Sequence, residues 1–202
     1  MSKLYFIHAP MNGGKSAHLL MKAHSFLEND TPILCLKPSI DNRENCEKIN
    51  SRIGLSIECL TIDIDDNIYL IINDYCSNME GMGQPIPKWI LCDESQFFTE
   101  EHINQLAKIV DILDINVMCY GLRNDFTGHL FEGSKRLFEL ADNIEEIKLS
   151  CKCGKKAIIN ARIDEYGSIL REGEQILIGG NESYKSMCRQ CFFKNKDENE
   201  II

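Results

Sequence analysis

Residues 9–16 read Ala-Pro-Met-Asn-Gly-Gly-Lys-Ser and differ at one position from the phosphate-binding pattern G-x-x-x-x-G-K-[ST]. Gly14 allows backbone N–H groups to turn toward a phosphate, and the start of the following helix attracts anions. Lys15 would reach the β- and γ-phosphates, and Ser16 would offer its hydroxyl to Mg²⁺. Ala9 stands where the pattern has its first glycine, which alanine can replace if its φ is negative. The alternative is an ordinary strand–turn–helix connection with Lys15 in solvent.

A second part of the site, which is acidic, is expected where the apolar run Trp-Ile-Leu-Cys ends on Asp93 and Glu94. Nucleotide-binding proteins of this type place an aspartate near Mg²⁺ at the end of a buried strand. The adjacent Glu94 could polarise a water molecule or accept the proton of an acceptor hydroxyl. Without the phosphate loop, these acids could simply mark the end of a strand.

Four cysteines near the C-terminus form two close pairs, Cys151-x-Cys153 and Cys188-x-x-Cys191, with 34 residues between Cys153 and Cys188. Four thiolates suit a closed tetrahedral Zn²⁺ site, which would hold both ends of the intervening segment and contribute folding energy. Such a segment could act as a lid. Reduced cysteines without a metal are the alternative.

Strand-like and helical patterns alternate along residues 1–150. The strand-like runs lie at 3–9, 32–39, 57–63, 88–95, 115–122 and 144–150. The helical patterns lie at 16–30, 66–80, 99–114 and 132–141. Thr99 is the expected N-cap of the third helix. Because most strand-like runs are apolar throughout, we expect an α/β fold: a phosphate-loop core with a mainly parallel sheet flanked by helices.

From Cys151 the sequence changes to short strand-like pieces without a clear helix. We therefore expect a core at 1–150, a small zinc-ribbon domain at 151–193 and a charged tail at 194–202. The net charge of −9 in 202 residues disfavours a nucleic-acid polymer as partner. No run is long and apolar enough for a membrane span, no secretory signal is evident, and we expect a cytoplasmic protein.

The phosphate loop, the Asp-Glu strand end and the four cysteines occur in an order that resembles the type II thymidine kinases. Further stretches carry the resemblance: DESQFF, GLRNDF, LSCKCG and IGGNESYKSMCRQC. Family members vary at the position of Ala9. The resemblance implies ATP-dependent phosphorylation of thymidine and deoxyuridine in nucleoside salvage, with Mg²⁺ and a structural Zn²⁺. It also implies a homotetramer inhibited by dTTP, and a lid segment, called the lasso, that folds over the nucleoside.

The resemblance also implies roles for individual residues, with Glu94 as the catalytic base. ATP and Mg²⁺ would be bound by Ala9, Pro10, Met11, Asn12, Gly13, Gly14, Lys15, Ser16, Asp93 and Gln96. The nucleoside would contact Met11, Leu122, Phe126, Ile176, Leu177, Ile178, Gly179, Gly180 and Tyr184. Zinc would be held by Cys151, Cys153, Cys188 and Cys191.

Some features allow other interpretations. Met11, Phe126 and Tyr184 could serve packing or surface roles alone. Asp41 and Arg43 also fit the family but receive no role here, and Arg43, Arg52 and Arg123 are equal candidates for contacting the transferred phosphoryl group. A nucleic-acid ATPase is the main alternative function, because the ribbon is richer in cations than the core. Its cations are Lys152, Lys155, Lys156, Arg162, Lys185, Arg189, Lys194 and Lys196. A GTP-binding switch is disfavoured, since no N-K-x-D stretch is present.

Overall fold

The computed structural model describes residues 1–39, 47–175 and 183–197. Its centre is a sheet of six parallel strands. In spatial order the strands are β5 (Leu60–Ile62), β2 (Ile33–Pro38), β6 (Trp89–Cys92), β7 (Asn116–Gly121), β1 (Leu4–His8) and β8 (Asn143–Glu146). The expected α/β core with a parallel sheet is thereby confirmed.

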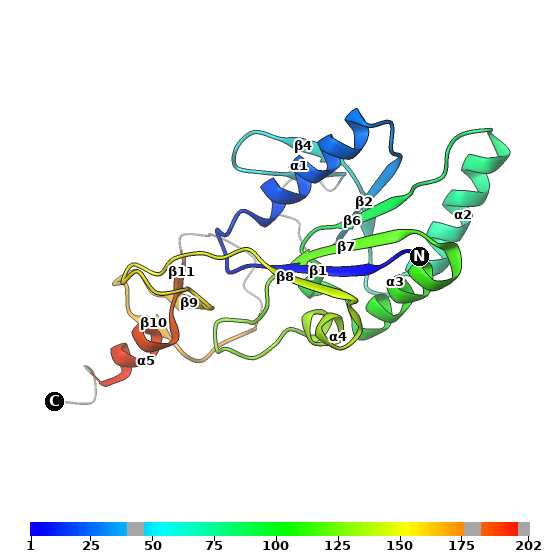
Figure 1. Cartoon of the computed structure of the whole chain (residues 1–202). Coiled ribbons are helices and arrows are strands. Elements are labelled where there is room, and N and C mark those ends of the chain that lie inside the picture. Colours follow the sequence, from blue (N-terminus) through cyan, green and yellow to red (C-terminus); the bar gives the residue numbers. More distant parts are fainter. Residues whose placement is uncertain (40–46, 176–182, 198–202) are drawn as a thin grey trace.

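Helices cover both faces of this sheet (Figure 1). On one face α1 (Lys15–Glu28) packs with its residues Leu19, Leu20 and Ala23 against alternate strand residues such as Ile7 and Leu91. The other face is covered by α2 (Ile68–Gly81), α3 (Glu100–Leu113) and α4 (Glu132–Leu140). Since successive strand side chains point to opposite faces, burial on both faces explains the nearly continuous apolar strands.

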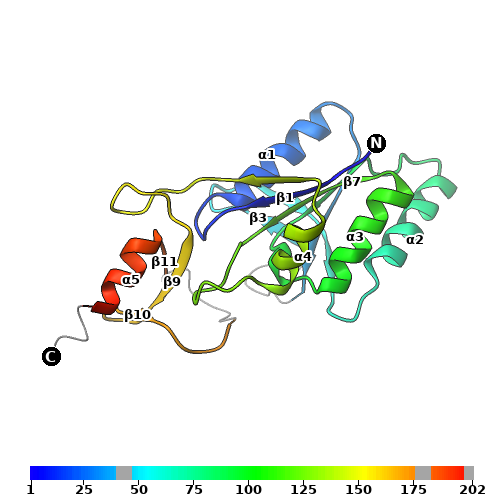
Figure 2. The same cartoon turned by 60° about the horizontal axis from the view of Figure 1, so that its bottom comes forward.

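The C-terminal part forms a separate small sheet. Strand β9 (Ile159–Ile163) lies between β10 (Ile169–Leu170) and β11 (Tyr184–Met187), and both neighbours are antiparallel to it. Helix α5 (Arg189–Asp197) follows β11. We call β9, β10, β11 and α5, together with the turn at residues 151–157, the ribbon; Figure 2 shows it at the end of the molecule away from α2 and α3.

Three local features differ from the sequence expectation. The run at 57–63 is divided at Cys59: β4 (Ser56–Glu58) forms a hairpin with β3 (Lys48–Asn50), whereas β5 joins the main sheet. Strand β8 ends at Glu146 rather than continuing to residue 150. Helix α5 was not indicated, and it continues beyond residue 194, where a charged tail was expected. Its Phe192 is only 3% exposed and packs with Ile159 and Ala161 of β9, so tertiary burial supports this helix.

Capping of α3 agrees with the sequence. The Thr99 hydroxyl accepts a hydrogen bond from the backbone N–H of His102 at 3.1 Å. The acidic residues Glu100 and Glu101 occupy the first turn, where their negative charges interact favourably with the positive end of the helix dipole.

In the described residues no helix is long and apolar enough to cross a membrane.

Gly133 allows α4 to approach the short 3₁₀ helix η1 (Ser95–Phe97). A Cβ atom at this position would lie 2.5 Å from the carbonyl oxygen of Phe98 and 2.6 Å from that of Ser95. We expect Gly133→Ala to lower the free energy of unfolding by about 1–3 kcal/mol, because backbone atoms must shift. Denaturant unfolding would measure this change. Gly81→Ala is the control, since an added Cβ there meets nothing within 4 Å; equal stability of the two variants would contradict the expectation.

Candidate active site

Three loops meet at the carboxyl edge of the main sheet. Residues 9–14 follow β1, Asp93 follows β6, and Leu122 follows β7. Because β6, β7 and β1 are consecutive parallel neighbours, the ends of these strands lie side by side. Ligands of open α/β sheets bind outside this edge. The fold therefore brings together the phosphate-loop and acidic residues that lie about 80 positions apart in sequence.

The loop after β1 has the backbone of an anion-binding turn. Asn12 and Gly14 have positive φ values of 63° and 79°, and Lys15 is the first residue of α1. No side chain caps this helix end and no acid occupies its first turn, so its N–H groups are suited to an anion. Ala9 is absent from the described residues with positive φ, which satisfies the condition for replacing glycine. An added Cβ on Gly13 would lie 2.7 Å from the Cβ of Ala9, so Gly13 must stay small.

Asp93 is a buried carboxyl group beside the phosphate loop. It is 5% exposed, and its backbone N–H donates to the carbonyl of Leu36 on β2 at 2.9 Å. Burial and the nearby Glu94 carboxylate raise the pKa of Asp93 from 3.8 to about 6. A hydrogen bond from the Ser16 hydroxyl and the charge of Lys15 act in the opposite direction and lower this pKa. These contacts place the acid and the residues Lys15 and Ser16 in one site.

Glu94 is held in an uncommon backbone conformation with a φ of 48°. Non-glycine residues in this region carry a conformational cost of about 1–3 kcal/mol and cluster at functional sites. Gln96 fixes the side chain: its amide Nε2 donates to Glu94 Oε2 at 2.6 Å, while its Oε1 accepts from the Leu122 N–H at 2.9 Å. The carboxylate is thus oriented by a side chain that is itself anchored to the loop after β7.

Phe126 and Tyr184 come together through Arg162, which the sequence analysis named only among the cations of the ribbon. The guanidinium carbon of Arg162 lies 3.8 Å from the centre of the Phe126 ring. Arg162 Nη2 donates to the Tyr184 hydroxyl at 2.7 Å, and Nη1 donates to the carbonyl of Glu174 at 2.9 Å. Arg162 is only 5% exposed. Its alternation with apolar residues on β9 was a strand signal, but the sequence did not indicate that this polar face is buried against the core.

Asp125 fixes the loop that carries Phe126. Its Oδ1 accepts hydrogen bonds from the backbone N–H groups of Thr127 and His129 at 2.9 and 3.0 Å. Its Oδ2 accepts from the Gln175 side chain at 2.9 Å. Although burial alone raises the pKa of Asp125, the hydrogen bonds from Thr127 and Gln175 leave it below its usual value. Gln175, which follows β10 of the ribbon in the sequence, therefore ties the segment after β10 to this loop.

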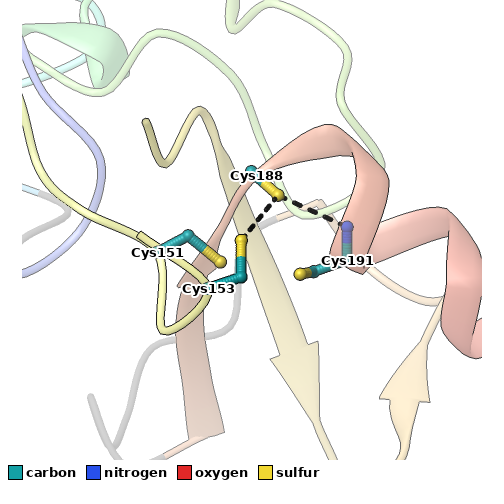
Figure 3. A group of neighbouring side chains, drawn as sticks. All are labelled: Cys151, Cys153, Cys188 and Cys191. Atoms are coloured by element: carbon teal, nitrogen blue, oxygen red, sulfur yellow. Dashed lines mark hydrogen bonds between the residues drawn. The ribbon is translucent and has the colours of Figure 1, made fainter. Parts of the chain in front are cut away.

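The four C-terminal cysteines form one cluster (Figure 3). Their sulfur atoms all lie within 4.8 Å of one another, and Cys153 Sγ is 3.6 Å from Cys188 Sγ. Tetrahedral zinc with Zn–S bonds of about 2.3 Å separates its sulfur atoms by about 3.8 Å, so this donor set can hold such a metal. Hydrogen bonds from the backbone at Cys153 and Cys188 lower the pKa of Cys151 to about 6. Hydrogen bonds with Cys153 and Cys188 raise that of Cys191 to about 12.

A model of the thymidine kinase family matches residues 2–192. This chain belongs to the thymidine kinase family. It is 43% identical to the thymidine kinase of Legionella pneumophila strain Philadelphia 1, over 98% of this chain and 92% of the relative. It is 45% identical to that of Shouchella clausii and 44% identical to that of Listeria monocytogenes strain F2365, each over 95% of this chain and 96% of the relative. The similarity to Pif1 helicase from Candida albicans is weak, with a TM-score of 0.42 and 14% identity over 73% of this chain and 36% of that one.

The predicted site residues of this thymidine kinase fall into two groups. The first group lies in the described residues and consists of the phosphate-loop residues, Asp93, Glu94, Gln96, Leu122, Phe126, Tyr184 and the four cysteines. Ile176, Leu177, Ile178, Gly179 and Gly180 lie outside the described residues, as do Asp41 and Arg43. Gln96 contacts Glu94 and Leu122, so its predicted contact with ATP or Mg²⁺ stays a prediction. Arg52 and Arg123 are exposed.

Asp93 should lower the stability of the ligand-free kinase at neutral pH. Its pKa of about 6 in the folded chain exceeds the ordinary value of 3.8. Folding therefore disfavours the charged carboxylate, and this cost is fully present once the pH is above about 6. We expect Asp93→Asn to raise the free energy of unfolding by about 1–3 kcal/mol at pH 7–8. As the pH falls below both pKa values, to about pH 3, the carboxyl group is neutral in the folded and the unfolded state, and the difference should vanish.

Thermal or denaturant unfolding without Mg²⁺ and nucleotide, at several pH values, would measure this effect. Asp111→Asn, an exposed change on α3, is a control for loss of one negative charge. A variant at Asp93 that is less stable than the wild type at pH 8 would contradict the raised pKa.

Proposed function

We propose that this member of the thymidine kinase family transfers the γ-phosphoryl group of ATP to the 5′-hydroxyl of thymidine, and also of deoxyuridine, in nucleoside salvage. Family membership gives the reaction class, since the chain matches the family model almost throughout. The observation that carries the assignment of residues is the junction of Lys15, Ser16, Asp93 and Glu94 at one edge of the sheet. Phosphoryl transfer requires mainly positioning and charge neutralisation, and these residue types provide both.

The phosphate loop, Asp93 and Glu94 would have separate roles in the reaction. The N–H groups of Gly14, Lys15 and Ser16, at the start of α1, would bind the phosphates, with the Lys15 side chain contacting the transferred group. Ser16 and Asp93 would hold Mg²⁺, which neutralises phosphate charge when bound. Glu94 would accept the proton of the 5′-hydroxyl, and Gln96 would keep its carboxylate oriented toward the acceptor. The positive φ of Glu94 supports this role, because residues other than glycine adopt this conformation rarely and mostly at functional sites.

The nucleoside would bind between the loop after β7 and the ribbon. Leu122 and Phe126 would line the apolar side of this pocket, with Met11 at the phosphate loop and Tyr184 at the ribbon. Arg162 supports the arrangement, since its guanidinium group contacts both Phe126 and Tyr184 and binds the Glu174 carbonyl. The predicted contacts of residues 176–180 with the base complete the proposal.

Zinc is the metal we propose for the cysteine cluster. The sulfur spacing fits tetrahedral coordination, and a divalent cation would stabilise several thiolates that otherwise repel one another. Among its described residues the ribbon has only small apolar clusters, such as Ile159, Ala161 and Phe192, so a metal would supply stability that its core does not. Metal-bound thiolates suit a reducing compartment, and we propose the cytoplasm.

We further propose a homotetramer whose nucleoside pocket also binds dTTP as a feedback inhibitor. The support is the family to which the chain belongs. The ribbon cations support the nucleic-acid ATPase alternative less than their number suggests, because Arg162 is buried and Lys156 donates to Glu146 Oε2 at 2.7 Å. A neutral nucleoside also suits a chain of net charge −9 better than a polyanion does.

Glu94→Gln should retain binding of ATP and thymidine but lose most of its turnover, by about 10²–10⁴-fold, because the amide cannot accept the proton. The assay incubates purified protein with Mg-ATP and an equimolar mixture of deoxynucleosides, and mass spectrometry identifies the monophosphates. Thymidine monophosphate should dominate for the wild type. Glu101→Gln on α3 is a matched control.

Two outcomes of this assay would count against the proposal. Wild-type turnover by Glu94→Gln would reject the catalytic base. ATP hydrolysis only after addition of DNA or RNA, without any monophosphate, would instead favour the nucleic-acid ATPase.

Cys188→Ser should release the bound metal and loosen the ribbon, because Cys188 contacts the sulfur of Cys153 and accepts from the Cys191 N–H. Metal analysis and limited proteolysis of the ribbon would measure this. Cys76→Ser on α2 is the control, as it lies far outside the cluster in sequence. Full retention of zinc by Cys188→Ser would reject the proposed ligand.

A further inference from the structure

Strands β9 and β11 of the ribbon carry four polar side chains on one face, in two adjacent cross-strand pairs. Arg162 of β9 is opposite Tyr184 of β11, and Asn160 is opposite Ser186. Residues two apart on a strand point to the same face, so both pairs face the core. Arg162 and Tyr184 meet the loop that carries Phe126, as described above. The second pair contacts a different part of the core.

Asn160 and Ser186 hold the backbone of Met11 in the phosphate loop. The Met11 N–H donates to Asn160 Oδ1 at 2.7 Å, and the Met11 carbonyl accepts from the Ser186 hydroxyl at 2.7 Å. Asn160 is 2% exposed, and its Nδ2 donates to the carbonyl of Asn124 at 3.1 Å. Its amide therefore joins the phosphate loop to the loop after β7. These two side chains satisfy both backbone polar groups of the residue that precedes Asn12.

We propose that Ser186 and Asn160 are positioning residues for the phosphate loop, so that the ribbon forms part of the ATP site as well as covering the nucleoside. This proposal rests on the proposed binding of ATP by residues 9–16. Asn12, next to Met11, has a φ of 63°, an uncommon conformation for a residue other than glycine. Hydrogen bonds on both sides of Met11 keep this turn in one conformation, which lowers the entropy lost when phosphate binds.

The geometry has a consequence for the two substrates. Tyr184 and Ser186 lie two residues apart on β11, and Arg162 and Asn160 lie two residues apart on β9. A nucleoside that orders the ribbon at Tyr184 also orders the pair that holds Met11. Ordering by one ligand reduces the entropic cost of the second, which gives positive coupling between thymidine and ATP.

The test is equilibrium binding of a non-hydrolysable ATP analogue with Mg²⁺, by calorimetry, to the full chain with and without thymidine. Ser186→Ala removes one hydrogen bond to Met11 and should weaken analogue binding by roughly two- to tenfold. It should also reduce the gain in affinity that thymidine produces. Ser186→Thr restores the hydroxyl and should restore binding. Ser168→Ala, on the exposed hairpin between β9 and β10, is the matched control and should bind as the wild type does.

Zinc content and thermal unfolding of each variant show whether the ribbon is intact. Wild-type analogue affinity for an intact Ser186→Ala would overturn the proposal. If Ser186→Ala fails to fold, Asn160→Ala tests the same point, because it removes the acceptor for the Met11 N–H; wild-type affinity and coupling for an intact Asn160→Ala would overturn the proposal as well. Lys15→Ala tests the ATP site separately from the positioning residues. Unchanged analogue binding by that variant would reject residues 9–16 as the ATP site itself.

Discussion

The parallel alignment of β6, β7 and β1 is the constraint on which the site depends. It places the loops after these strands at one edge of the sheet, and it brings the Asp93 carboxyl group within reach of the Ser16 hydroxyl. The aspartate is buried at a cost, visible in its raised pKa, and that cost is offset only partly by Ser16, Lys15 and the Glu94 N–H. A cation that neutralises this carboxylate would therefore bind at a site already prepared for it.

The ribbon extends this arrangement rather than standing apart from it. Its apolar clusters are small, and its polar face makes hydrogen bonds to the phosphate loop and to the carbonyl of Asn124. Arg162 on this face is buried against Phe126, where it bonds to the Tyr184 hydroxyl and to the backbone carbonyl of Glu174. A metal at the four cysteines would fix the base of the ribbon and so support contacts that lie some distance away in the fold.

Local patterns in the sequence were sufficient for much of the core. The apolar runs of β2, β6 and β7, the Thr99 cap and the close spacing of the cysteines each depend on neighbouring residues, so they can be recognised without a structure. Helix α5 was missed because its support comes from Phe192 packing on β9, a contact that the local sequence does not express. The division of residues 57–63 was missed because the two halves pair with different strands, β3 and β2.

The sequence by itself determined the glycine-rich loop after the first strand, the acidic strand end, the two close cysteine pairs and the family. These features depend on residue type and short spacing, which fix the local backbone and the available chemistry. Only the tertiary structure decided that Gln96 orients Glu94, that Arg162 joins Phe126 to Tyr184, and that Asn160 and Ser186 hold Met11. Met11 and Ser186 are 175 positions apart, and only the packing of the ribbon against the core brings them within hydrogen-bond distance.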